Sequence, residues 1–116
     1  MTASAYSLSA AVPSAGFTVT KGEPVLGGLR AELDHQFCPN CMSWLFTRFD
    51  AFVNVRVTML DDPAPFPPFI ESCTDEKLPW ATTPAVHSFE KFPAPEEYEG
   101  LIEEYAKHTK VSADAT

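Results

Sequence analysis

The fold of this chain is organised around the stretch Phe37-Cys38-Pro39-Asn40-Cys41-Met42-Ser43-Trp44-Leu45-Phe46. Pro39 and Asn40 favour a turn, because proline fixes its own φ and asparagine tolerates the left-handed region. Two cysteines three positions apart on a tight turn can present two thiolates to one metal ion from the same side. The bulky residues after the turn supply apolar surface to anchor it. The stretch therefore predicts half of a metal site, with Cys38 and Cys41 as ligands, at the start of a strand.

A structural zinc ion needs four ligands, so two more must come from elsewhere. The chain holds one further cysteine, Cys73. The open sources are His35, the pair Cys73 and His87 if the fold brings them close, and a second copy in a homodimer. Readings without metal are plain buried thiols and, for His35, an exposed position in a loop. A thioredoxin-like redox role is disfavoured because no βαβ pattern surrounds the cysteines.

The composition is that of one domain with a core of its own. The 116 residues are 45% hydrophobic, and their 11 prolines and 9 phenylalanines favour short strands and long loops over a helical bundle. The formal net charge of −8, without a basic run, argues against a nucleic-acid partner. We find neither a membrane-spanning stretch nor a signal peptide. An odd cysteine count without an export signal indicates a reducing compartment, and we expect a cytoplasmic protein.

Alternation of apolar and polar residues predicts strands over residues 6–10, 17–20, 43–48 and 52–60. The last is the strongest, with Val53, Val55, Val57 and Met59 expected on one face and the intervening polar residues on the other. Asp61 and Asp62 end it, and we interpret them as a turn and its cap rather than as paired catalytic carboxylates. Trp80 is assigned to the core.

One helix is predicted over residues 96–107. Pro95 lies near its first turn, where a missing N–H costs little, and acidic residues follow at the positive end of the helix dipole. Its apolar stripe, typical of a helix docked on a sheet, consists of Tyr98, Leu101, Ile102 and Tyr105. We expect a single domain over residues 1–110 and a C-terminal tail over residues 111–116.

The order of several short motifs resembles that of a known family. The motifs are Phe37-Cys38-x-x-Cys41, Ser43–Phe46, Leu60–Pro63 and Lys77–Trp80, together with Ser4-Ala5-Tyr6, Gly16-Phe17 and Gly22-Glu23-Pro24. Through them, nearly the whole chain up to the final helix resembles the glutathione-dependent formaldehyde-activating enzyme family, which is related to centromere protein V. The resemblance implies a mainly β, Mss4-like fold, with several small coiled antiparallel sheets near a zinc site, to which the pattern adds one C-terminal helix.

The resemblance also implies a zinc-dependent carbon–sulfur lyase that acts on a glutathione adduct. In that family an N-terminal Cys-x-Cys completes a four-cysteine structural zinc site with the later Cys-x-x-Cys, which Cys38 and Cys41 match. A further cysteine cluster holds the catalytic zinc. Neither upstream set is matched here, so we assign no catalytic and no cofactor-binding residue. Met42 stands where the family usually has glycine, and its cost in a left-handed turn, about 1–2 kcal/mol, predicts a less tight turn.

Two explanations fit the unmatched ligands: a start downstream of them, or a member that has lost both zinc sites. Either way we expect a zinc-binding family member with an incomplete metal site and weak or no catalysis. The alternative is a metal-free structural or interaction domain. The expected partners are a glutathione adduct and a second copy of the chain, and neither nucleic acid nor a membrane.

Overall fold

The computed structural model describes residues 5–28 and 32–114, except for the side chains of residues 109–114. It divides into two compact units, Met1–Phe66 and Pro67–Thr116, which are described one at a time. Ser4, part of the family-like N-terminal motif, lies outside the described residues.

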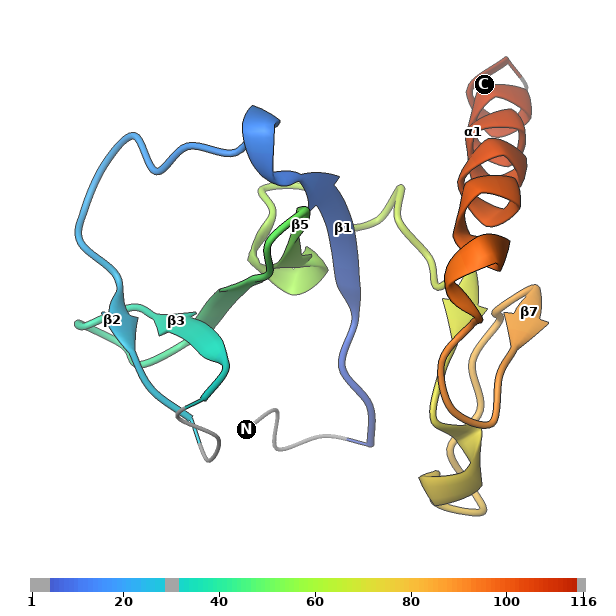
Figure 1. Cartoon of the computed structure of the whole chain (residues 1–116), viewed down its shortest axis with the longest axis horizontal. Coiled ribbons are helices and arrows are strands. Elements are labelled where there is room, and N and C mark those ends of the chain that lie inside the picture. The colour runs from blue at the N-terminus through green and yellow to red at the C-terminus, as the bar shows by residue number, and fades with distance from the viewer. Residues whose placement is uncertain (1–4, 29–31, 115–116) are drawn as a thin grey trace. The chain divides into compact units, whose positions relative to one another are not determined.

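The first unit is built on a five-stranded antiparallel sheet with the order β1-β5-β4-β3-β2 (Figure 1). Its strands are β1 (Ser9–Pro13), β2 (Val25–Leu26), β3 (Asp34–Phe37), β4 (Trp44–Arg48) and β5 (Phe52–Arg56). The middle strands β3, β4 and β5 pair with their neighbours in the sequence, whereas β1 returns to pair with β5. The predicted mainly β class is confirmed.

The sequence pattern located some of these strands better than others. The strand expected over residues 43–48 is present as β4, and the one expected over residues 6–10 lies slightly later, as β1. The prediction for residues 17–20 is wrong. Phe17 and Val19 are half-buried between exposed threonines, so the alternation is real, but this segment joins no ladder among the described strands. Period-two burial therefore marks an extended chain and not necessarily a paired one.

The strand expected over residues 52–60 ends early. β5 stops at Arg56, and a 3₁₀ turn, η2 (Val57–Met59), follows. The buried N–H of Val57 donates to the carbonyl of Leu8, just before β1 begins, and Leu60 closes the turn back onto Val57. Val53 and Val57 are indeed buried, but Met59 is 46% exposed. The single apolar face predicted for this segment is therefore broken by the turn.

Glycine allows a close approach at the other side of the sheet. A Cβ on Gly27 would lie 2.9 Å from Cδ1 of the Phe37 ring, which is closer than side-chain carbons pack. The Gly27 N–H also donates to the carbonyl of His35, directly beside the pairing of β2 with β3. This contact holds Phe37, the residue before the cysteine turn, in the core of the first unit.

The second unit contains a small sheet and a helix. β6 (Ile70–Glu71) and β7 (His87–Ser88) pair in parallel, which corrects the expectation that the small sheets are antiparallel. A 3₁₀ turn, η3 (Thr74–Glu76), lies between these strands. A second 3₁₀ turn, η4 (Pro95–Glu97), leads into α1 (Tyr98–Asp114). None of the described helices is long and apolar enough to cross a membrane.

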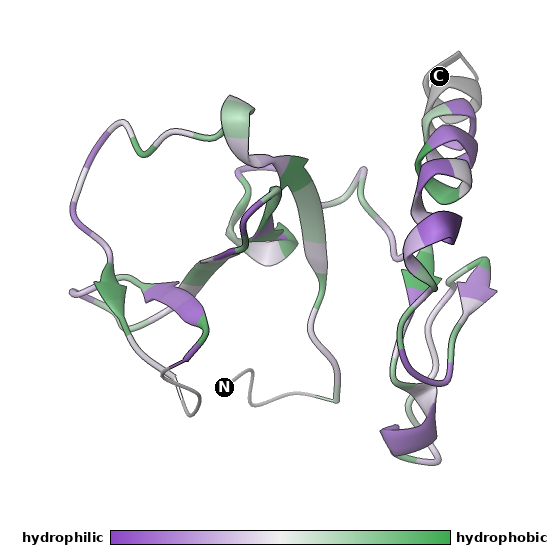
Figure 2. Cartoon of the chain, viewed as in Figure 1, coloured by the Kyte–Doolittle hydropathy of each residue, from purple (hydrophilic) through white to green (hydrophobic). Residues whose placement is uncertain are grey.

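The helix α1 packs on the small sheet through aromatic residues of this unit. The Phe69 ring lies 5.4 Å from those of His87 and Tyr105, between ring centroids, and the His87 Nε2 lies 2.7 Å from Oε2 of Glu104. The predicted stripe is only partly used: Leu101 and Tyr105 are half-buried, but Ile102 is 66% exposed. In Figure 2 the helix is accordingly coloured mostly hydrophilic, with scattered hydrophobic positions.

The bounds of the helix and tail and the burial of Trp80 differ from what the sequence predicted. The helix begins at Tyr98, after η4, and continues through residues 111–114 of the expected tail, while residues 115–116 lie outside the described residues. Trp80, expected in the core, is 71% exposed. A single domain over residues 1–110 stays a prediction.

Candidate metal centre

The cysteine turn connects β3 to β4 and is closed by two backbone hydrogen bonds. The Cys38 N–H donates to the Ser43 carbonyl at 2.9 Å, and the Met42 N–H donates to the Cys38 carbonyl at 2.8 Å. A bulge between Gln36 and Phe37 shifts the register just before the turn. The two bonds fold residues 38–43 back on themselves, which places both cysteines at the tip of one hairpin.

Met42 adopts the left-handed conformation that glycine favours. Its φ is +62°, so the turn is as tight as a glycine at this position would allow, and the expectation of a looser turn is wrong. The side chain is 61% exposed, so it meets little resistance from neighbouring atoms. The strain of about 1–2 kcal/mol is borne by the two backbone hydrogen bonds and by the packing on either side of the turn.

The two thiols differ in exposure and electrostatics. Cys38 is half-buried and Cys41 is exposed, and both are free thiols. The Cys41 Sγ–H donates to Oγ of Ser43 over 3.2 Å. Hydrogen bonds from the Ser43 side chain and backbone, and then from the Cys38 side chain, lower the pKa of the Cys41 thiol. Metal ions bind thiolates, so this shift favours Cys41 as a ligand near neutral pH.

A buried polar cluster, consisting of His35, Trp44, Thr47 and Arg56, supports the turn from β3, β4 and β5. The Thr47 Oγ1 lies 2.6 Å from Nδ1 of His35 and accepts a hydrogen bond from Nε1 of Trp44 at 3.0 Å. Thr47 is only 2% exposed. Because one hydroxyl joins an imidazole and an indole, the first residue of β4 is fixed in orientation directly after the turn.

His35 belongs to this cluster and not to a loop. It lies in β3 opposite Thr47 and is 6% exposed, so the interpretation as an exposed loop histidine is wrong. Its hydrogen bond to Thr47 uses the Nδ1 nitrogen. The sequence gives little sign of this burial, because residues 34–37 carry no clear alternation and the partner that buries His35 lies twelve positions away.

Arg56 completes the cluster and was not foreseen. Its guanidinium carbon lies 4.5 Å from the centre of the Trp44 ring, a cation–π arrangement. The residue is 8% exposed, and burial lowers the pKa of its guanidinium. Its Nη1 atom finds no hydrogen-bond partner in the described part of the chain. The arginine thus contributes mainly by covering the indole that comes after the turn.

The other ligand candidates lie in the second unit. Cys73 is half-buried and has φ of +58°, and the His87 Nε2 is engaged by Glu104. Within residues 5–28 and 32–114, no group of three or more His, Cys, Asp or Glu residues is arranged to hold a metal ion. The interpretation of Asp62 as a turn residue is confirmed, because its Oδ1 accepts a hydrogen bond from the Ala64 N–H at 3.3 Å.

Comparison with known proteins identifies a family for most of the chain. Residues 1–76 match the family described as "Glutathione-dependent formaldehyde-activating enzyme". No curated protein matches this sequence. The matched region contains the whole first unit and the cysteine turn, and it ends just before Lys77–Trp80, so it is shorter than the resemblance drawn from the sequence. The Mss4-like fold of that family agrees with the mainly β structure.

Proposed function

The chain belongs to the glutathione-dependent formaldehyde-activating enzyme family, and we propose that it is a zinc-binding domain of that family with weak or no lyase activity of its own. Cys38 and Cys41 are its zinc ligands in this proposal. The observation that carries it is the left-handed Met42, which keeps the cysteine turn tight although the residue is not glycine.

The residues present fit half of a structural zinc site. Two thiols stand at the tip of one hairpin, and hydrogen bonds from Ser43 lower the pKa of the Cys41 thiol, which favours the thiolate form that binds a metal ion. Zinc in a structural site has four ligands, and the described residues offer no third one beside this pair. When bound, the ion would tie the hairpin tip to whatever group supplies the other two ligands.

A second copy of the chain is a chemically complete source of those ligands. Cys41 is exposed, so its sulfur is accessible to another molecule. Two hairpin tips that meet around one ion supply four thiolates, which is a common structural zinc set. The resulting homodimer contains one zinc ion for every two chains.

Zinc content and assembly state test this proposal together. Native mass spectrometry of the purified protein at neutral pH should give a dimer with one zinc ion. The double variant Cys38→Ser/Cys41→Ser should contain no zinc and be a monomer, whereas Cys73→Ser, the matched control at the third cysteine, should keep both. Folded wild-type protein that contains no zinc after growth in zinc-supplemented medium would contradict the proposal.

The proposed lack of catalysis has its own readout. The family activity implies that an active member speeds the joining of formaldehyde to glutathione. With zinc supplied, we expect the rate with protein to equal the uncatalysed rate. A rate increase that disappears in Cys38→Ser/Cys41→Ser but persists in Cys73→Ser would show that the turn takes part in catalysis and would overturn this half of the proposal.

A metal-free interaction domain is the second candidate. It is favoured by the absence of a three-ligand group from the described residues. It predicts that the wild-type protein and the double serine variant have the same melting temperature, with and without a chelator. Under the zinc proposal, a chelator lowers the melting temperature of the wild-type protein only.

A further inference from the structure

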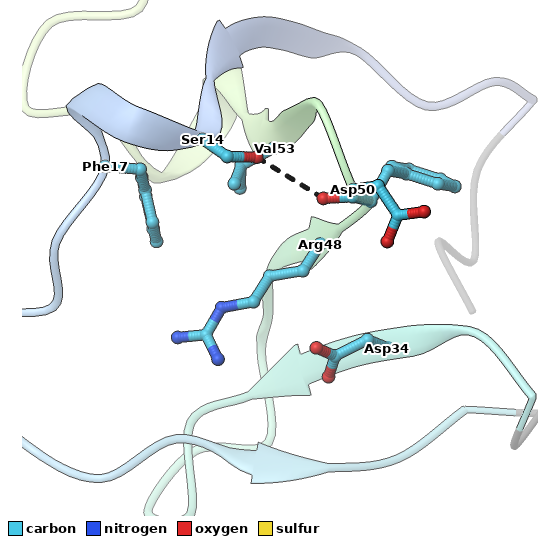
Figure 3. A pocket seen from close by; sticks show the side chains of 7 residues that line it. Ser14, Phe17, Asp34, Arg48, Asp50 and Val53 are labelled. Carbon is cyan, nitrogen blue, oxygen red and sulfur yellow. Dashed lines mark hydrogen bonds between the residues drawn. The ribbon is translucent and has the colours of Figure 1, made fainter.

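A hollow lies at the end of the β3–β4 hairpin opposite the cysteine turn. It has a volume of about 480 Å³ and lies wholly within the first unit. Its polar lining comes from Ser14, Asp34, Arg48 and Asp50, and its apolar lining includes Phe17 and Phe49 (Figure 3). The hollow contains neither cysteine of the turn, so a ligand bound in it would be independent of the proposed zinc ion.

The wall of the hollow is held in place by backbone contacts. Ser14 belongs to a 3₁₀ turn, η1 (Ser14–Gly16), after β1. Its Oγ donates to the Phe49 carbonyl at 3.3 Å, the bond drawn in Figure 3, and its N–H donates to the Ala51 carbonyl at 3.2 Å. These bonds tie η1 to the β4–β5 loop, so two sides of the hollow are fixed relative to each other.

Arg48 and Asp34 face the hollow as neighbours that are not paired with each other. They lie directly opposite in the β3–β4 register, the position at which an ion pair forms most easily. Among the described residues, however, no ion pair joins them. The Asp34 carboxylate accepts a hydrogen bond from Nε2 of Gln36, and the guanidinium carbon of Arg48 lies 5.2 Å from the centre of the Phe46 ring.

The N–H donors of the Arg48 guanidinium are therefore available to a ligand. An arginine side chain has five N–H donors in a planar fork that matches a carboxylate. In Figure 3 the Arg48 side chain extends from β4, with its guanidinium on the side of the hollow lined by Phe17 and Asp34. The same space is bordered by the Asp34 carboxylate, which has acceptor capacity beyond its bond to Gln36.

The charges around the hollow select the kind of ligand. One positive and two negative side chains line it, from Arg48, Asp34 and Asp50. A phosphate or sulfate ion would be repelled by two carboxylates, and a simple amine would bind the carboxylates but leave the Arg48 guanidinium without an acceptor. A ligand with one charge of each sign satisfies both. In an α-amino acid the carboxylate and the ammonium group are attached to the same carbon, a separation that suits two cross-strand neighbours.

We propose that this hollow binds the zwitterionic head group of an α-amino acid. The carboxylate lies on the Arg48 guanidinium, and the ammonium group lies on Asp34, with Asp50 adding negative potential nearby. The volume exceeds that of the head group, and Phe17, Phe49 and Val53 supply apolar surface. The bound amino acid therefore has an apolar side chain of moderate size, such as that of leucine.

Three probes with one side chain test this assignment on the unmodified protein. L-leucine carries both charges, L-leucinamide only the ammonium, and N-acetyl-L-leucine only the carboxylate. In NMR titrations of ¹⁵N-labelled protein, L-leucine should shift the amides of residues 14–17 and 48–53 in a saturable way. Each half-charged analogue should bind about tenfold more weakly, because one charge-assisted contact is lost. No saturable shift, or equal binding of all three probes, would overturn the proposal.

Variants then assign the two contacts. Arg48→Gln should lower the affinity for L-leucine by about tenfold but leave that for L-leucinamide unchanged. Asp34→Asn should also lower the affinity for L-leucine by about tenfold but leave that for N-acetyl-L-leucine unchanged. The matched control is Lys21→Gln, which removes an exposed cation outside the hollow and should change neither. An equal loss in Lys21→Gln would mean that only net charge matters, and the site would be rejected.

Discussion

Two neighbouring cross-strand pairs of the β3–β4 hairpin treat their polar side chains in opposite ways. His35 and Thr47 lie opposite each other and are joined by a hydrogen bond, and Thr47 also accepts one from Trp44. In the next pair, Arg48 and Asp34 stand opposite each other in register and remain apart. Both pairs belong to one sheet, so strand pairing alone does not decide the difference.

Burial explains this contrast. Thr47 is 2% exposed, and a buried hydroxyl without partners would cost free energy, so the cluster around it is fully bonded at that hydroxyl. Arg48 is exposed and can exchange a protein partner for water at little cost. A buried polar group thus reports on stability, whereas an exposed and unpaired charge in a hollow is available for a ligand. Substitutions in the two neighbouring pairs and in the cysteine turn test this distinction.

The largest effect is expected from Thr47→Val. Valine has the same shape but cannot bond to His35 or Trp44, so both partners lose a hydrogen bond inside the core. We expect the free energy of unfolding, measured in urea, to fall by about 2–4 kcal/mol. Thr18→Val, at an exposed position, is the control and should change it by less than about 0.5 kcal/mol. A similar small change in Thr47→Val would show that the cluster does not stabilise the turn.

A smaller effect of opposite sign is expected from Met42→Gly. Glycine adopts the φ of +62° without strain, and the exposed methionine side chain leaves little packing to lose. After the greater flexibility of glycine in the unfolded chain is counted, thermal or urea unfolding should show a gain of about 0.5–1 kcal/mol. Met59→Gly is the matched control, because Met59 has no positive φ and should be destabilised by this change. Destabilisation at both positions would mean that Met42 is unstrained.

In the charged pair, Arg48→Gln should hardly change stability. The Arg48 side chain is exposed and forms no ion pair with Asp34, so the loss is limited to its contact with the Phe46 ring. We expect a change in the free energy of unfolding within about 0.5 kcal/mol. A loss of more than about 1.5 kcal/mol, a size typical of buried partners, would place Arg48 among the structural residues and remove the contrast between the two pairs.

The last prediction concerns the pH dependence of cysteine reactivity and not the free energy of unfolding. The Ser43 side chain is the largest cause of the lowered pKa of the Cys41 thiol. Because the thiolate is the reactive form, a lowered pKa makes alkylation by iodoacetamide reach half its maximal rate at a lower pH than for an ordinary cysteine. In Ser43→Ala the pKa should rise, and the half-maximal point, followed by peptide mass spectrometry, should move to higher pH. Cys73 in the same sample is the control, and a shift shared by both cysteines would point to a cause other than Ser43.

The sequence predicted the parts of this fold that depend on local pattern. The cysteine turn, β4 and the turn at Asp62 follow from turn-forming residues and alternation, and the family followed from the order of short motifs. Contacts between residues of different strands could not be predicted from local pattern. His35 and Arg56 are polar, and their partners, the Thr47 hydroxyl and the Trp44 indole, belong to another strand.

The candidate site was foreseen in its residues but not in its surroundings. Cys38 and Cys41 were identified as a pair, yet the left-handed Met42 was not expected, because the hydrogen bonds and packing that offset its strain are visible only in the structure. The hollow beside Arg48 carries no motif. Its residues come from η1 and the segment just after it, from β3, β4 and β5, and from the loop between β4 and β5, and pairing in space brings them together.

The pairing of β1 with β5 has a consequence for the order of folding during synthesis. β3 pairs with β4 and β4 with β5, so these three strands can form a meander as soon as they leave the ribosome. β1 is made before the other strands of this sheet but lacks its strand partner until Phe52–Arg56 has been made. The sequence of β1, Ser-Ala-Ala-Val-Pro, contains small residues and ends in proline, so the unpaired strand is a poor template for aggregation.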